Sequence, residues 1–299
     1  MTFDIITGDA LDVLKTLPEN HFHTCISSPP YFGLRSYGVE GQIGLEETPE
    51  EYIEKIVRVF REVRRVLRKD GSLWLNIGDS YWGSAKGFGH DWANSPKQRS
   101  NKGSLFSREH KPVTMGKHPF YKPKDLMCIP FLVAVELMKD GWYLRQDIVW
   151  NKLNTLPESV RDRCSRSHEY IFLLTKSRDY YFDCDAILED GREGKRRLRS
   201  VWSVNIKPIK GHHATFPPKL IEPCVKAGTG KDCCKGCGAI ICDCNDVKVP
   251  CRVLDPFNGS GTTGVVALAH GADYVGIELN PEYAKLSKDR LQGEIGMFE

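Results

Sequence analysis

The chain has 299 residues, and its 42 Lys and Arg residues nearly balance 39 Asp and Glu, for a formal charge of +3. This charge does not mark a strongly basic protein, so any nucleic-acid surface must come from local clusters. There is no apolar run of eighteen residues, which argues against a membrane-spanning helix, and the start, MTFDIITGDA, lacks the basic region of a signal peptide. Eleven cysteines without a leader favour reduced thiols in a cytosol.

The first thirty residues predict a strand, a short helix and a second strand. Residues 3–7 (FDIIT) and 23–27 (HTCIS) are apolar runs typical of strands, and the segment 8–18 between them places leucines at every third position. The second strand leads directly into the tetrapeptide SPPY at 28–31.

A long amphipathic helix and a third strand come next. Thr48, Pro49 and Glu51 combine an N-cap, a first-turn proline and a capping-box acid. We expect this helix to end at Lys69-Asp70-Gly71 and a strand to span 72–81. Residues 83–124 are rich in Gly, Ser, Lys and Arg, which is typical either of an ordered insertion that contacts nucleic acid or of a flexible loop in the free protein. We expect this segment to be mobile without nucleic acid.

The middle of the chain predicts one helix and two strands at the edge of a sheet. The helix lies within 126–138 and starts near Pro130, and the strands are 143–150 and 168–175. The loop between these strands carries three arginines, Arg161, Arg163 and Arg166, which we place near the ligand-binding cleft expected at the edge of an open α/β sheet.

Residues 192–199 (REGKRRLR) form the densest basic run in the chain, and Trp202 follows them. We expect this run to contact nucleic-acid phosphates, since Lys and Arg supply the sequence-independent part of nucleic-acid affinity. The alternative is a solvated basic loop.

The most informative stretch is 251–280, CRVLDPFNGSGTTGVVALAHGADYVGIELN. It predicts a strand ending at Asp255, a glycine turn, a helix over 263–270 and a strand over 274–277 that ends at Glu278. The turn contains GxGxxG at Gly259, Gly261 and Gly264. With an acid about 20 residues after the first glycine, this pattern keeps a nicotinamide-dependent oxidoreductase open as an alternative.

A single helix, 281–291, follows Glu278, so the other strands of a doubly wound sheet must come from upstream. If the chain is circularly permuted, strand 3–7 extends one half of the sheet and strand 23–27 begins the other half beside strand 251–255. The loops after Ser27 and Asp255 then lie side by side at the switch point where ligands bind. The predicted fold is a doubly wound, mostly parallel α/β sheet.

Ser28-Pro29-Pro30-Tyr31, followed far downstream by Asp255-Pro256-Phe257 and Gly259-Ser260-Gly261, resembles the DNA amino-methyltransferases of the permuted β group. The resemblance covers about residues 1–80 and 125–299. It implies a Rossmann-like fold that binds S-adenosyl-L-methionine, double-stranded DNA as substrate, and a cytoplasmic enzyme of a bacterial or phage-infected cell. It leaves open the recognition sequence, the oligomeric state and the presence of a cognate restriction endonuclease.

The tetrad suits methylation of an exocyclic amino group, whose lone pair is delocalised into the base. The Ser28 hydroxyl and the Pro29 carbonyl can accept its hydrogens, while Pro29 and Pro30 leave no competing N–H donors in the loop. Tyr31 offers a face on which an extruded base can stack. A serine in first position usually accompanies cytosine N4 in this family, so we favour cytosine N4 and keep adenine N6 as the alternative.

The resemblance also assigns cofactor positions. The glycine turn and Asp255 would hold the amino-acid end, Glu278 the ribose and Asp9 the adenine, with a segment at 212–228 packing as a helix against the cofactor. His212 in that segment is carried over as well. The full expected set is Asp9, Ala10, Thr215, Phe216, Pro217, Asp255, Pro256, Phe257, Gly259, Ser260, Gly261, Thr262, Glu278 and Asn280.

The cysteine-rich loop at 229–248 departs from the family pattern. A CxxC followed closely by CxC suggests a structural zinc site made of Cys234, Cys237, Cys242 and Cys244, although the spacing between the two pairs is shorter than usual. The alternative is a reduced, cysteine-rich surface loop.

These patterns divide the chain into a catalytic half, 1–82; a basic flexible insertion, 83–124; remaining sheet strands, 125–182; a target-recognition segment, 183–211; and a cofactor-binding half, 212–299. A non-catalytic DNA-binding protein that retains the fold is a further alternative.

Overall fold

The computed structural model describes residues 1–34, 37–83, 117–155, 158–206 and 216–295. An eight-stranded sheet organises these residues. Its strands, in spatial order, are β1 (Phe3–Thr7), β12 (Asp273–Glu278), β11 (Arg252–Asp255), β2 (Phe22–Ser27), β3 (Leu67–Ile77), β5 (His168–Thr175), β4 (Tyr143–Asn151) and β8 (Val201–Ser203). All neighbours are parallel except those of β5, which is antiparallel to β3 and to β4.

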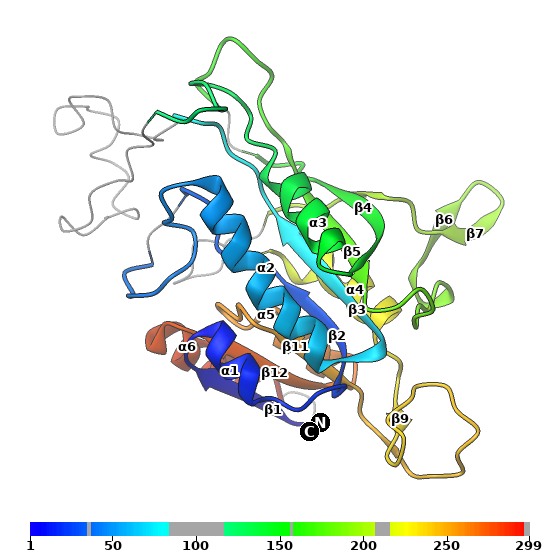
Figure 1. Ribbon diagram of the computed structural model, residues 1–299. Coiled ribbons are helices and arrows are strands. Elements are labelled where there is room, and N and C mark those ends of the chain that lie inside the picture. The colour runs from blue at the N-terminus through cyan, green and yellow to red at the C-terminus, as the bar shows by residue number, and fades with distance from the viewer. Residues whose placement is uncertain (35–36, 84–116, 156–157, 207–215, 296–299) are drawn as a thin grey trace.

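Helices cover both faces of this sheet (Figure 1). On one face lie α1 (Ala10–Thr16), α2 (Pro49–Val66) and α3 (Ile129–Lys139), and on the other lie α4 (Pro218–Gly228), α5 (Thr262–Ala269) and α6 (Pro281–Ile295). The doubly wound, mostly parallel fold predicted from the sequence is therefore confirmed. The predicted permuted order is also observed, because β11 pairs with β2 on one side and with β12 on the other.

The edge of the sheet differs from the expectation. Strands β4 and β5 pair as predicted, but they are not outermost, because β8 adds to β4 in parallel. Its tryptophan, Trp202, is buried and donates its indole N–H to the carbonyl of Arg199 at 2.7 Å. A strand of three residues is too short to show a period in the sequence.

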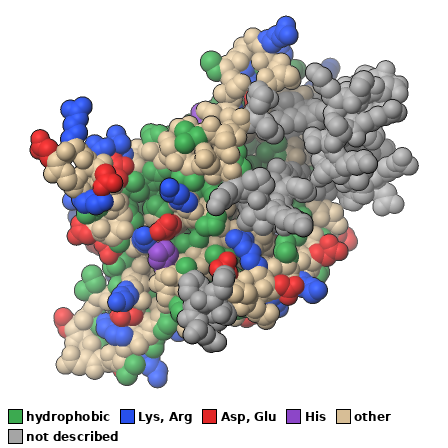
Figure 2. Space-filling view, turned by 180° about the vertical axis from the view of Figure 1, so that it is seen from behind, with side chains coloured by type: hydrophobic (Ala, Val, Ile, Leu, Met, Phe, Trp, Pro, Cys, Tyr) green, Lys and Arg blue, Asp and Glu red, His purple; other side chains and the backbone are tan. Residues whose placement is uncertain are grey.

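Most of the basic run at 192–199 lies in the turn and second strand of a hairpin. This hairpin is made by β6 (Leu188–Gly191) and β7 (Gly194–Arg197) and follows a short 3-10 helix, Asp185–Ile187. Glu189 pairs with Arg196 at 2.8 Å and with Arg199 at 2.6 Å, and Asp190 pairs with Lys195 at 2.6 Å. Acidic and basic side chains are also mixed over the face seen in Figure 2. Part of the basic charge is thus compensated within the hairpin.

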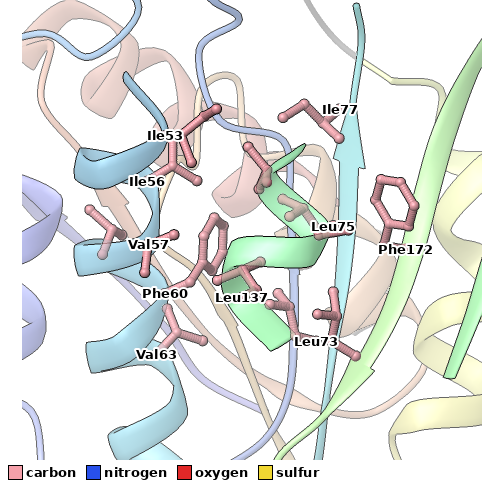
Figure 3. Packing of buried hydrophobic residues seen from close by; sticks show 14 of the residues in the cluster. Ile53, Ile56, Val57, Phe60, Val63, Leu73, Leu75, Ile77, Leu137 and Phe172 are labelled. Atoms are coloured by element: carbon pink, nitrogen blue, oxygen red, sulfur yellow. The ribbon is translucent and has the colours of Figure 1, made fainter. Parts of the chain in front are cut away.

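The core beneath α2 explains why that helix forms. Thr48 caps it by accepting from the Glu51 N–H at 3.3 Å, and Pro49 occupies its first turn, as expected. Its apolar side chains point at β3, β5 and α3 (Figure 3). The residues in this contact include Ile53, Ile56, Val57, Phe60, Val63, Leu73, Leu75, Ile77, Leu137 and Phe172.

The predicted boundary between α2 and β3 was wrong. The helix ends at Val66 and the strand starts at Leu67, and pairing with β2 shifts register before Ser72. Gly71 sits at this irregularity, where an added Cβ would lie 3.0 Å from the carbonyl oxygens of Arg68 and His23. The glycine therefore serves a bulge in the strand rather than a helix stop.

Other predicted elements match closely, apart from α4 and the end of β3, which stops at Ile77 rather than at 81. That helix begins at Pro218 rather than at 212, and His212 and Thr215 lie outside the described residues. Most of the predicted insertion, 84–116, and residues 207–211 of the predicted recognition segment also lie outside them. In the part of the chain that the structure describes, no helix has both the length and the apolar character needed to cross a membrane.

Candidate active site

The turn between β11 and α5 brings the backbone close to neighbouring groups. Gly259 has φ +53° and donates its N–H to Glu278 Oε2 at 2.7 Å. Gly261 has φ +76°, and a Cβ there would lie 2.3 Å from Ser287 Oγ. A Cβ on Gly264 would lie 2.6 Å from the ring of a buried tyrosine on β12. All three GxGxxG positions thus require glycine for conformation or close packing.

Asp255, at the end of β11, joins the two tracts that the sequence separates. Its Oδ1 accepts from Ser27 Oγ at 2.6 Å and from the Phe257 N–H at 3.0 Å, and its Oδ2 accepts from Thr263 Oγ1 at 2.7 Å. The carboxyl is 1 % exposed, and this burial raises its pKa to about 6. Both oxygens are used within the chain, so Asp255 fixes the loop after β2 against the glycine turn.

A cleft with about 860 Å³ of empty space, partly open to solvent, lies at this end of the sheet. Ser28 and Pro30 of the tetrad line it together with the glycine turn, so the predicted juxtaposition is observed. The predicted site residues in its wall are Asp9, Ala10, Ser28, Pro30, Phe216, Asp255, Pro256, Phe257, Gly259, Ser260, Thr262 and Glu278. The wall also includes Tyr37, Val39, Gln42, Ile43, Leu279 and Tyr283, which the sequence analysis missed. The glycines at 38, 41 and 44, all with positive φ, were the only sequence signal for that tight loop.

Two carboxylates in the wall are oriented by backbone groups. Glu278 accepts from the N–H of Gly259 through Oε2 and from the N–H of Asn280, at 2.9 Å, through Oε1. Burial raises the pKa of Glu278. Asp9 is the N-cap of α1 and accepts from the Asp12 N–H at 3.1 Å.

Several predicted site residues lie outside the wall of this cleft. Asn280 instead caps α6 by accepting from the Glu282 N–H at 2.9 Å, Pro217 is the N-cap of α4, and Gly261 packs on α6. Pro29 is buried and is not among the residues that line the cleft. Tyr31 also lies outside the lining and makes polar contacts of its own.

The Tyr31 ring packs on Gly78, where an added Cβ would lie 2.5 Å from a ring carbon. Its hydroxyl lies 2.9 Å from Glu169 Oε2, 3.2 Å from Asn76 Oδ1 and 3.4 Å from Ser28 Oγ. Glu169 comes from β5, 138 residues away, so sequence spacing gave no signal for this contact.

Lys152 is the next residue in this set of polar contacts around the Tyr31 hydroxyl. Lys152 forms an ion pair with Glu169 Oε1, and its Nζ lies 4.3 Å from the centre of the Trp150 ring. The Lys152 and Glu169 side chains are only 15 % and 17 % exposed. Such exclusion of water strengthens the attraction between the two opposite charges.

The three arginines expected near the cleft have varied surroundings. Arg163 pairs with Glu158 at 2.6 Å and lies 4.0 Å from the centre of the Tyr81 ring. Arg166 lies 3.7 Å from buried Asp79. Arg161 is exposed.

The four predicted zinc ligands come together. The Sγ atoms of Cys234, Cys237, Cys242 and Cys244 all lie within 4.8 Å of one another, and those of Cys237 and Cys244 are 3.7 Å apart. Thiolates around a tetrahedral zinc at about 2.3 Å would be about 3.8 Å apart. The Cys237 N–H also donates to Cys234 Sγ at 3.5 Å. The donor set and its spacing therefore fit zinc, between the short strands β9 (Cys233–Cys234) and β10 (Lys248–Val249).

A second group, His23 with Cys233 and Cys251, also has its ligand atoms within 4.8 Å. Here, however, both ring nitrogens are occupied, because Nδ1 accepts from the Arg252 N–H and Nε2 donates to the Gly238 carbonyl, each at 2.9 Å. Burial lowers the pKa of His23 to about 4, so the ring is neutral. This histidine anchors the cysteine loop to β2 and does not suit a metal.

Comparison with known proteins identifies the family. The model of the N6/N4 DNA methylase family matches residues 22–289. The type II methyltransferase M.XycI of Xanthomonas campestris pv. cyanopsidis is 47 % identical over 293 residues, covering 97 % of this chain and 88 % of its own length. M.Cfr9I of Citrobacter freundii is 45 % identical over 292 residues, with the same coverage.

Two solved structures resemble this chain over nearly its whole length. PvuII DNA methyltransferase, described as cytosine-N4-specific, has a TM-score of 0.65 and 17 % identity over 99 % of this chain and 92 % of its own. A Thermus thermophilus protein described as a DNA modification methylase, solved with S-adenosyl-L-methionine, has a TM-score of 0.60 and 25 % identity over 99 % of this chain and 96 % of its own. The literal GxGxxG therefore does not indicate a nicotinamide enzyme. This chain belongs to the N6/N4 DNA methylase family, the DNA amino-methyltransferases.

Proposed function

We propose that this enzyme transfers the methyl group of S-adenosyl-L-methionine to the N4 amino group of a specific cytosine in double-stranded DNA. The observation that carries the proposal is the meeting of Ser28 and Pro30 with the glycine turn in one cleft. A serine opens the tetrad, and in this family that residue usually accompanies cytosine N4. Adenine N6 is the second candidate, because the family includes both activities.

The donors and acceptors of the cleft fit S-adenosyl-L-methionine, whose sulfonium supplies an electrophilic methyl group when it is bound. Glu278 can accept from the ribose hydroxyls, and the glycine turn allows close backbone approach to the amino-acid end. Tyr37, Ile43 and Tyr283 supply the apolar and aromatic surface that an adenine requires. Asp9 also lines the cleft.

Ser28 and the Pro29 carbonyl would orient the amino group of an extruded base. By accepting its hydrogens, they would favour a pyramidal nitrogen whose lone pair faces the methyl carbon. The C–N bond then forms as the methyl–sulfur bond breaks, and the nitrogen afterwards loses a proton to water. The chain's contribution is orientation and electrostatics, and extrusion is needed because the amino nitrogen is out of reach within a duplex.

Methylation mapping tests both the activity and the base. DNA from cells that lack other DNA methylation and express this protein would be digested to nucleosides and sequenced for modified positions. We expect N4-methylcytosine at one recognition sequence, whereas N6-methyladenine would establish the second candidate. Unmodified DNA, with purified protein that also transfers no label from S-adenosyl-L-methionine, would overturn the assignment in favour of a non-catalytic DNA-binding protein.

The same DNA tests the partner proposed here, a cognate restriction endonuclease, which the names of the type II relatives suggest. DNA methylated at the mapped sequence should resist cleavage by an endonuclease that cuts this sequence. Cleavage at the unmodified rate would contradict a protective role.

Ser28→Ala tests the role of the tetrad. We expect transfer to be abolished while affinity for S-adenosyl-L-methionine stays within a few fold, because the hydroxyl is assigned to the base rather than to the cofactor. Ser203→Ala, on outer strand β8, is a control for loss of a hydroxyl. Turnover equal to wild type in Ser28→Ala would remove Ser28 from the mechanism.

We further propose one structural zinc at Cys234, Cys237, Cys242 and Cys244. Support comes from four converging sulfur atoms and from the Cys237 N–H that donates to Cys234. None of these cysteines lines the cleft, so the ion would hold the loop between β9 and β10 together rather than take part in methyl transfer.

Metal analysis of protein purified without added zinc tests this site. We expect about one equivalent in the wild type, and less than about 0.2 equivalents would count against zinc because closed thiolate sites bind tightly. Cys237→Ser should lose the ion. Cys164→Ser, which removes an exposed cysteine elsewhere, should retain it.

A further inference from the structure

The Tyr31 hydroxyl links Ser28 to the Lys152–Glu169 ion pair. Each oxygen of Glu169 has one partner here, since Oε1 faces the Lys152 ammonium and Oε2 lies 2.9 Å from the phenol oxygen. The phenol oxygen in turn lies 3.4 Å from Ser28 Oγ, a long contact of the kind that tightens when a substrate binds.

The ion pair fixes the direction of these hydrogen bonds. The carboxylate paired with Lys152 accepts, as does Asn76 Oδ1, so the single proton of Tyr31 is donated toward one of these two acceptors. The phenol oxygen is then free to accept, and its neighbour on that side is Ser28. The Ser28 hydroxyl therefore donates to Tyr31 and leaves its oxygen lone pairs for the cleft.

Asn76 does not provide an alternative donor. Its Nδ2 donates to the Tyr170 carbonyl at 3.0 Å, which turns Oδ1 toward the phenol. Tyr31 thus faces two acceptors and no donor other than Ser28 among the described contacts of its hydroxyl. Burial raises the pKa of Tyr31 well above its usual value, so the phenol stays protonated.

We propose that Glu169 is a positioning residue which, through the Tyr31 hydroxyl, fixes Ser28 as a hydrogen-bond acceptor and so selects an amino group over a carbonyl on the target base. The inference rests on the proposed function and holds for either base. Cytosine and adenine present N–H donors to Ser28, whereas uracil and hypoxanthine present a carbonyl oxygen at the same position. Two acceptors facing each other lose a hydrogen bond and leave a polar group unpaired.

Binding to two DNA duplexes that differ only in the target base tests whether the site selects an amino group over a carbonyl. Each duplex contains the mapped site with the target position opposite an abasic site, so that base pairing no longer differs. One duplex carries the amino base and the other its carbonyl analogue, and affinities are measured with S-adenosylhomocysteine present. We expect the wild type to prefer the amino base by about tenfold or more, because sites built for one hydrogen-bond polarity reject the other.

Tyr31→Phe and Glu169→Gln should each leave the Ser28 hydroxyl free to donate its hydrogen to the base, for different reasons. Phenylalanine removes the acceptor for that proton, while a glutamine amide can donate to the phenol and reverse the chain. Both variants should reduce the preference to within about twofold and lower kcat about 10- to 100-fold, with KM for S-adenosyl-L-methionine unchanged. Retained cofactor affinity also shows that the variants fold.

Two controls make matched changes away from this group. Tyr143→Phe removes an exposed hydroxyl from β4, and Glu136→Gln breaks an exposed carboxylate–lysine pair on α3. Both should keep the wild-type preference. Tyr31→Phe with an undiminished preference would overturn the inference, as would a wild type that methylates DNA but binds both duplexes equally. A wild type that methylates no DNA would instead overturn the proposed function, and the inference with it.

Discussion

Asp255 shows how much of a residue's role can lie outside its motif. The sequence placed it at a strand end, which is a usual position for a ligand contact in this fold, and in the structure it lines the cleft. Its two carboxylate oxygens also accept from Ser27, Thr263 and the Phe257 N–H. This second role within the chain has no sequence signal, because Ser27 lies 228 residues away.

The raised pKa of Asp255 predicts an unusual pH dependence of stability. Its pKa is about 6 in the folded chain and lower when unfolded, so between about pH 4 and 6 the folded state binds the extra proton. This group therefore stabilises the fold most at low pH and loses that contribution as pH rises through 6. The full effect is about 2–3 kcal/mol.

Thermal unfolding of wild type and Asp255→Asn across about pH 4.5–7.5 isolates this contribution. Asparagine cannot titrate, while other groups titrate alike in both proteins. The melting temperature of the wild type, relative to the variant, should rise as the pH falls. A difference that stays constant with pH would mean that the carboxyl has an ordinary pKa.

Gly261 tests the close approach at the turn. An alanine there would suffer both a positive φ and a Cβ 2.3 Å from Ser287 Oγ. Gly271→Ala is the matched control, since its φ of +82° is similar but nothing lies within 4 Å of the added carbon. We expect the control to cost about 1 kcal/mol of unfolding free energy and Gly261→Ala clearly more, measured by chemical denaturation.

The double variant Gly261→Ala with Ser287→Gly then separates the two causes. Removing the serine side chain should recover the steric part of the loss and leave the cost of the positive φ. If the double variant is no more stable than Gly261→Ala, the clash with Ser287 is not the cause.

At the level of elements, the sequence predicted best where local signals agreed. The unit β11–turn–α5–β12 was predicted nearly to its ends, because a strand, three glycines and an acid occur in one short stretch. The α2–β3 boundary was misplaced because a glycine in a bulge and a glycine after a helix look alike in sequence. Strands β6, β7 and β8 have three or four residues each and were missed, since such short segments show no period and β8 also depends on a distant partner, β4.

The β6–β7 hairpin gives a test at this scale, because Glu189 alone holds two arginines. If the hairpin contacts DNA phosphates, Glu189→Gln should free Arg196 and Arg199 for that contact. We expect higher affinity for any duplex at low salt, with the slope of log K against log salt steeper by about one to two.

Glu54→Gln is the control for this experiment. It makes the same change in total charge at an exposed position on α2, away from the hairpin. Equal salt slopes for the two variants would mean that the hairpin does not face the DNA.

On the scale of the whole molecule, the permuted order of the strands was predictable because the tail of the chain could not supply a full sheet. The pairing of β11 with β2 follows from that shortage. The surroundings of Tyr31 could not be predicted from the sequence, because β5 is antiparallel and its register brings Glu169 to the tetrad from 138 residues away. The cleft wall at Tyr37–Ile43 was also missed, since that loop has no period.

One cleft shared by β1–α1, the tetrad loop and the glycine turn predicts that ligand binding stabilises the whole domain. S-adenosyl-L-methionine at about 100 times its Kd should add about 2.7 kcal/mol and raise the melting temperature by roughly 5 °C. Glu278→Gln should reduce the shift, since it weakens acceptance from the ribose hydroxyls. NADH at the same concentration should give no shift, because the cleft is assigned to a cofactor without phosphates. A shift with NADH and none with S-adenosyl-L-methionine would show that the glycine turn binds a dinucleotide after all.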